Sequence, residues 1–173
     1  MKIRMTLTLL TLISLIGCSK DSEVCKVNFQ IIKETLTFRH TWKLIGFQVE
    51  GQSNIDYPPC DLYKNNSDRI MTISFADTLS NLPDSIGFHK YPYLFKAIST
   101  INSFEGTYEI DSLNNLKTSD IFSTLKGGSG VLMDYEKKYY NALTNAKKYL
   151  IKDNILTIFY NQTDKMLFVS VDN

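Results

Sequence analysis

Three carboxylates recur at even spacing in one short segment, which is the arrangement that paired acid–base chemistry needs. Glu105, Glu109 and Asp111 would share one face if this segment is a β-strand. Two carboxylates on one face can act as general acid and base, or as acid and nucleophile. A solvated strand face gives the same pattern far more commonly, so we expect no catalytic site here.

The chain has only two histidines, His40 and His89, which stand 49 residues apart. Neither has Cys, Asp or Glu nearby at metal-ligand spacing, whereas a zinc site needs three or four convergent ligands. We therefore expect ordinary histidines, with no metal, no cofactor and no histidine-based catalytic centre.

The glycine-rich stretch 126–130 (KGGSG) invites comparison with a phosphate-binding loop. It lacks the order Gly-x-x-x-x-Gly-Lys-Ser/Thr, in which the lysine and the hydroxyl reach the phosphates. Ser129 is not a nucleophile elbow either, because Val131 stands where that turn needs glycine. We expect a flexible connection between a strand and a helix.

A cluster of aromatic residues lies between positions 88 and 95: Phe88, Tyr91, Tyr93 and Phe95. Such a cluster could form a docking patch for a ligand or a protein near the mouth of a barrel. Filling of the core is the alternative that we favour.

The first 17 residues are typical of an export signal, and a cysteine follows them directly. Lys2 and Arg4 precede ten mainly apolar residues, 7–16, which are too few to span a bilayer. The end of this run, Leu-Ile-Gly-Cys, resembles the bacterial lipobox. That resemblance implies cleavage before Cys18 and attachment of a diacylglycerol to its thiol, which anchors the protein stably when more than one acyl chain is present.

This signal predicts that the protein is localised in the cell envelope. Ser19 after the cysteine is unlike the Asp of an inner-membrane retention signal, so we expect the outer membrane, with the domain on its periplasmic or surface face. Residues 18–26 would then be a flexible tether, and residues 27–173 the folded domain. The alternative is a buried cysteine at the end of a core helix in a cytosolic protein.

Removal of 17 of the 173 residues leaves 156, enough for one domain with a real core. The mature chain would carry 17 basic and 18 acidic residues, because Lys2 and Arg4 leave with the signal. This near-neutral charge argues against nucleic acid as a partner. Cys25 and Cys60 remain as candidate disulfide partners, closing about 35 residues for roughly 4 kcal/mol, and two free thiols are the alternative.

Apolar alternation predicts a mainly β fold. We expect strands at 42–49, 70–75, 103–110, 116–125, 155–160 and 166–171, and an edge strand or irregular crossing at 88–98 because Pro92 interrupts it. Residues 27–36 are ambiguous. Trp42, Leu44 and Gly46 should face one side of the first strand, and Ile45 and Phe47 the other, with both sides covered for part of its length.

A helical stripe follows the glycine-rich stretch, with apolar residues at spacings of three and four: Tyr135, Tyr139, Ala142, Leu143, Ala146, Tyr149 and Leu150. We expect one helix through this region, packed against an antiparallel sheet. The predicted element order is β, β, β, β, β, α, β, β.

These residues resemble the META/HslJ-like domains of bacterial lipoproteins. Residues that match the family pattern are Trp42 and Leu44 in the first strand; Asn102, Phe104, Gly106 and Tyr108; Thr124; Glu136, Tyr140, Ala142 and Leu143 in the helix; and Tyr149, Leu156, Ile158, Leu167 and Phe168. The resemblance spans about 41–171, and implies an α+β fold: a small antiparallel barrel-like sheet with one C-terminal helix packed against it.

Two departures limit what the resemblance carries over. The family's internal cysteines are absent, since Ile101 precedes Asn102 and no cysteine stands near Thr124, and the region 51–92 is longer than usual. The expected function is a non-enzymatic envelope lipoprotein that binds or supports an unknown protein or small molecule. A carrier that uses the barrel interior and an envelope enzyme with an unrecognised site are the alternatives.

Overall fold

The computed structural model describes residues 29–31, 33, 36–59, 71–79, 91–128 and 130–171. Within them lie eight strands and one helix: β1 (Thr41–Gln48), β2 (Thr72–Leu79), β3 (Tyr93–Ile98), β4 (Ser103–Ile110), β5 (Leu116–Ser123), α2 (Val131–Thr144), β6 (Ala146–Lys152), β7 (Ile155–Tyr160) and β8 (Asp164–Ser170). Expectations for Cys18, Cys25, Cys60, Phe88, His89 and Ser129 fall outside the described residues.

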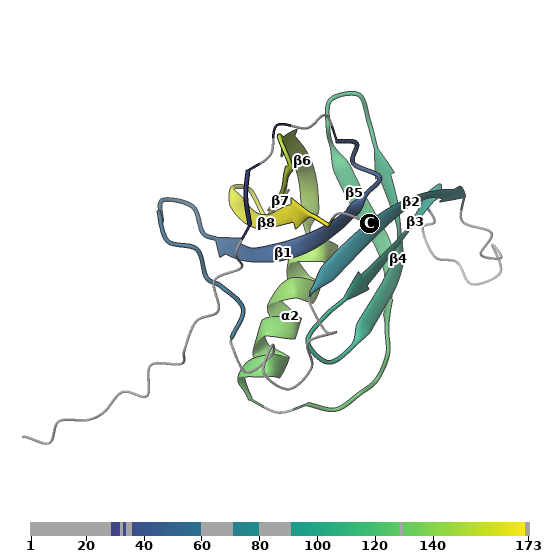
Figure 1. Ribbon diagram of the computed structural model, residues 1–173. Coiled ribbons are helices and arrows are strands. Elements are labelled where there is room, and N and C mark those ends of the chain that lie inside the picture. The colour runs from purple at the N-terminus through teal and green to yellow at the C-terminus, as the bar shows by residue number, and fades with distance from the viewer. Residues whose placement is uncertain are drawn as a thin grey trace, which may run out of the picture.

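The eight strands form one antiparallel sheet in the order β5-β4-β3-β2-β1-β8-β7-β6. The sheet curls around a common interior, and α2 runs from its lower end up to β6 (Figure 1). Its edge strands approach each other where the Tyr149 backbone N–H donates to the Asn114 carbonyl at 2.9 Å. The predicted fold class, a small antiparallel barrel-like sheet with one helix packed against it, is confirmed.

The interior of the curl is filled by side chains. The largest fully buried ones include Trp42, Tyr108, Tyr139, Phe47, Phe95, Phe104 and Phe168. Even the polar edge of Trp42 is satisfied, because its Nε1 donates to the Phe38 carbonyl at 3.1 Å. Burial of these rings supplies the main driving force for folding.

The predicted facing of β1 is wrong at Phe47. Leu44 pairs with Phe168 and Gly46 with Leu167, so Ile45 is an extra residue, a β-bulge. The bulge returns Phe47 to the interior with Trp42 and Leu44. Ile45 is nevertheless only 2% exposed, so both faces of β1 are covered there as expected.

The predicted helix is too long. It ends at Thr144, and residues 146–152 form β6, which adds a strand that the predicted order lacks. β6 pairs with β7 through a two-residue turn at Asp153 and Asn154, with Asp153 at φ +56°. Tyr149 and Ile151 pack against the core on alternate positions, a spacing that competes with the helical stripe over these few residues.

The expectation of an edge strand or irregular crossing at 88–98 is wrong, because β3 begins directly after Pro92 and pairs with β2 on one side and β4 on the other. In the turn between β4 and β5, Ile110 pairs with Leu116 and Asn114 takes φ +62°. Within the described part of the chain, no helix is long and apolar enough to cross a membrane.

Candidate functional site

Three of the motif residues that lie far apart in the sequence meet at one place. Asn102 comes from the β3–β4 turn, Thr124 follows β5, and Glu136 stands in the second turn of α2. We call this group, with Ser99 and the backbone of Ile101 and Lys126, the Glu136 clamp.

Glu136 is the centre of the clamp and is only 7% exposed. Its carboxylate accepts hydrogen bonds from the Ile101 N–H at 3.1 Å, the Asn102 N–H at 2.8 Å and the Asn102 side-chain amide at 2.7 Å. The Ser99 hydroxyl donates to it as well. Burial raises the pKa of Glu136, but these four hydrogen bonds outweigh burial, and the net pKa lies below its ordinary value.

Asn102 connects the carboxylate to the loop beyond β5. Its Oδ1 accepts from the Thr124 hydroxyl at 2.9 Å and from the Lys126 N–H at 2.8 Å. Thr124 in turn accepts from the Ser103 N–H at 3.1 Å. The clamp therefore fixes α2 to the β3–β4 turn and to the start of the glycine-rich stretch.

The chemistry of the clamp is structural. An ionised carboxylate whose pKa is lowered is a poor proton acceptor at neutral pH, and its oxygens are already occupied by donors. A buried carboxylate satisfied in this way specifies one arrangement of the elements that it joins.

Apart from Leu167, which is half-buried, the other motif residues lie in the core or pack against it. Trp42, Phe104 and Tyr108 are buried, and the Tyr108 hydroxyl donates to the Ala76 carbonyl at 2.9 Å. A Cβ on Gly106 would lie 2.7 Å from the Phe95 ring, so glycine is required where that ring crosses β4. The motif therefore divides into a core set and a clamp set.

The three carboxylates that suggested acid–base chemistry each have a different partner. Glu105 pairs with Lys96 at 2.9 Å, and Glu109 with Lys117 at 2.7 Å. Asp111 accepts from the Asn115 side-chain amide at 2.7 Å, which with backbone hydrogen bonds lowers the pKa of Asp111. Glu105 and Glu109 thus form ion pairs on the strand surface, and Asp111 stabilises the β4–β5 turn.

The remaining candidates are also placed by the fold. Phe95 is buried and Tyr93 packs against Tyr108, at 5.5 Å between ring centroids, so both contribute to the core. His40 lies edge-on to Trp42 at 5.5 Å. Among the described residues, no three His, Cys, Asp or Glu side chains converge as metal ligands would.

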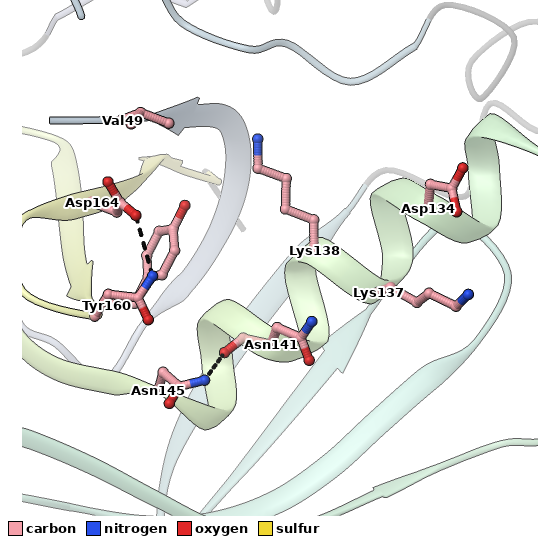
Figure 2. A pocket seen from close by; sticks show the side chains of 9 residues that line it. Val49, Asp134, Lys137, Lys138, Asn141, Asn145, Tyr160 and Asp164 are labelled. Atoms are coloured by element: carbon pink, nitrogen blue, oxygen red, sulfur yellow. Dashed lines mark hydrogen bonds between the residues drawn. The ribbon is translucent and has the colours of Figure 1, made fainter. Parts of the chain in front are cut away.

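A second place on the molecule combines polar groups with free space. A hollow of about 430 Å³ lies between α2 and the ends of β1, β7 and β8, and we call it the α2 hollow. Figure 2 shows the strand residues on one side and the helix residues on the other. Its lining residues are Val49, Asp134, Lys137, Lys138, Asn141, Asn145, Tyr160, Asn161 and Asp164.

Two of the charged residues in the α2 hollow have partners in the protein. Lys138 pairs with Asp56 at 2.5 Å and lies 4.6 Å above the Phe47 ring. Asp164 accepts from the Glu50 N–H and from the Asn161 amide, each at 3.2 Å. These contacts, to Phe47 in β1 and to Glu50 and Asp56 after it, fix the walls of the hollow.

Sequence reasoning missed the α2 hollow. The only signal was the polar face of the helix, where Lys137, Asn141 and Asn145 recur every four residues. From the sequence alone this face is expected to be exposed to solvent, and only the structure shows that β7 and β8 lie beside it.

A sequence model of the META domain matches residues 34–173. The chain belongs to the META domain family. The predicted family resemblance is therefore confirmed, and it covers the whole barrel and α2.

Solved structures support the fold of this META domain. One is a DUF4847 family protein from Bacteroides vulgatus ATCC 8482, 16% identical, with 78% of this chain and 94% of that chain covered at a TM-score of 0.50. Another is a protein from Burkholderia xenovorans, 14% identical, with 85% and 100% covered at a TM-score of 0.56. Among curated proteins, none matches the chain.

Proposed function

We propose that this META domain protein is a lipid-anchored protein of the bacterial envelope with a non-enzymatic binding or supporting role. Cys18 would carry the lipid, residues 1–17 would be the signal, and residues 18–26 the tether to a domain within 27–173. The outer membrane is the proposed site, because Ser19 is unlike the aspartate of an inner-membrane retention signal.

The observation that carries the non-enzymatic role is the state of the Glu136 clamp. Asn102, Thr124 and Glu136 are joined to one another by hydrogen bonds, and Trp42, Phe104 and Tyr108 fill the core. A catalytic group must have a free atom directed at a substrate, which these side chains do not offer. The motif residues thus stabilise the fold, and the binding or supporting role belongs to the surface of the protein.

The filled interior weakens the carrier alternative. A carrier needs an enclosed apolar cavity of about 300 Å³ or more. In the described barrel, Trp42, Tyr139 and Phe168 occupy that space with side chains of essentially no exposure. A ligand would therefore bind outside the barrel.

Mass spectrometry of the protein isolated from its native cells tests the anchor. We expect a chain that starts at Cys18 and carries acyl groups, and membrane fractions that lose the protein when Cys18→Ser is introduced. A chain that still begins at Met1 and lacks the mass of acyl groups would overturn the proposed localisation. The same spectrum, with and without reduction, reports whether Cys25 and Cys60 are joined.

A further inference from the structure

The α2 hollow contains polar side-chain groups without a hydrogen bond or ion pair to the described residues. Among the described residues, the Lys137 ammonium, the Asn141 amide and the Tyr160 hydroxyl have neither a hydrogen-bond nor an ion-pair partner. Tyr160 is 7% exposed, so its ring is fixed while its hydroxyl reaches the hollow. Figure 2 shows that hydroxyl directed away from the strand backbone and toward the space between Val49 and Lys138.

The charge of the lining favours an uncharged ligand. Lys137 and Lys138 are balanced by Asp134 and Asp164, so the nine lining residues carry no net charge. The Lys138 ammonium is further neutralised by Asp56. An anion would meet two carboxylates here, and a cation two ammonium groups.

The walls of the hollow are partly hydrocarbon. Val49, the Tyr160 ring and the alkyl stems of Lys137 and Lys138 supply carbon surface beneath the polar tips. The amide of Asn141 both donates and accepts hydrogen bonds, as does the Tyr160 hydroxyl. A sugar ring has the same two properties, with C–H groups on its faces and hydroxyls that donate and accept along its edge.

We propose that the α2 hollow binds a neutral saccharide, with Asn141 and Tyr160 as its hydrogen-bonding residues. The volume of about 430 Å³ lies within the range of small-molecule sites. Lys137 would contribute donors to ring hydroxyls, while Val49 would contact a sugar face.

The protonation of Tyr160 suits this role. Burial, with the nearby charges of Asp164 and Asp56, raises the pKa of Tyr160 to about 12. The hydroxyl therefore keeps its proton throughout the neutral range and can donate to a sugar oxygen as well as accept.

The saccharide site deepens the binding role proposed above and rests on it, but its test is separate from that of the anchor. The mature protein is purified in a zwitterionic detergent, and amide NMR signals are followed during titration with maltotriose and with triacetylchitotriose. Inorganic phosphate and acetate serve as anion probes. The mass of the same preparation reports lipidation, so the anchor and the saccharide site can fail independently.

We expect one of the two saccharides to shift the amide signals of Val49, Asn141 and Tyr160. Asn141→Ala and Tyr160→Phe should each raise its Kd about fivefold, the loss of one hydrogen bond. Two matched variants should leave the Kd unchanged within twofold. Gln162→Ala removes an exposed amide outside the α2 hollow, and Tyr140→Phe removes a hydroxyl from α2 that does not line it.

Three results would overturn the saccharide proposal. One is the absence of shifts with both saccharides, and another is a response to phosphate or acetate alone, which would indicate an anion site. The third is an equal loss of affinity in Gln162→Ala or Tyr140→Phe. Melting temperatures of all four variants establish that each is folded.

Discussion

The Glu136 clamp and the α2 hollow place polar side chains of the same helix in opposite situations. In the clamp, Glu136 is buried and accepts four hydrogen bonds. In the hollow, Asn141 stands little more than one turn later, and its side-chain amide has no partner among the described residues. A satisfied buried group stabilises the fold, whereas an unsatisfied group at the surface is free to bind.

Removal of the clamp carboxylate should give the largest effect. Glu136→Ala leaves the N–H groups of Ile101 and Asn102 without their acceptor in a buried place, so we expect a loss of about 3 kcal/mol in the free energy of unfolding. Urea denaturation measures it.

Glu105→Ala is the matched control for this change. Its carboxylate pairs with Lys96 across an exposed face, and such pairs contribute about 0–1 kcal/mol. Equal losses in the two variants would show that the clamp is no more structural than a surface ion pair.

The clamp should also make stability depend on pH. The pKa of Glu136 is lower in the folded protein than its ordinary value of 4.5, so the folded state binds the proton less well than the unfolded chain does. This contribution is fully present above about pH 5 and is lost as the pH falls through the lower folded pKa. Urea midpoints between pH 3 and pH 7 measure it.

Glu136→Gln isolates the clamp in that series. The variant keeps the size of the side chain but cannot titrate, so its acid slope should be shallower than that of the wild type. Identical slopes would mean that other carboxylates control acid stability.

A smaller effect is expected at the outer part of the clamp. Thr124→Val removes the hydroxyl between Asn102 and Ser103, and Asn102 Oδ1 keeps its second donor, the Lys126 N–H. We expect a loss of about 1 kcal/mol in the free energy of unfolding, read from urea curves. Thr124→Ser keeps the hydroxyl and should recover most of this loss; a serine variant as unstable as valine would assign the effect to packing.

The sequence was informative about the sheet and less so about its irregularities. Alternating apolar residues located most of the strands, because one face of each must be buried. The sequence pattern did not predict the bulge at Ile45 or the end of the helix at Thr144. Both depend on strand pairing. The pairing of β1 with β8 leaves Ile45 without a partner in the ladder, and the pairing with β7 makes residues 146–152 a strand of the sheet.

Sites depend even more on pairing than strands do. Asn102, Thr124 and Glu136 could be singled out as motif residues, but their hydrogen bonds join three elements that only the folded sheet brings together. The α2 hollow needs β1, β7 and β8 to lie beside the helix, and no short stretch encodes that arrangement.

The smallest expected effect on stability is at the α2 hollow, and it completes the comparison. Asn141→Ala removes a side chain without a partner among the described residues from an exposed helix position, and alanine is the better helix former. The free energy of unfolding should stay within about 0.5 kcal/mol of the wild type, or rise by that amount. A loss above about 1 kcal/mol in urea would make Asn141 a structural residue like Glu136. Unchanged stability together with a weakened saccharide response would instead assign Asn141 to binding, and would separate the two polar regions of α2 by experiment.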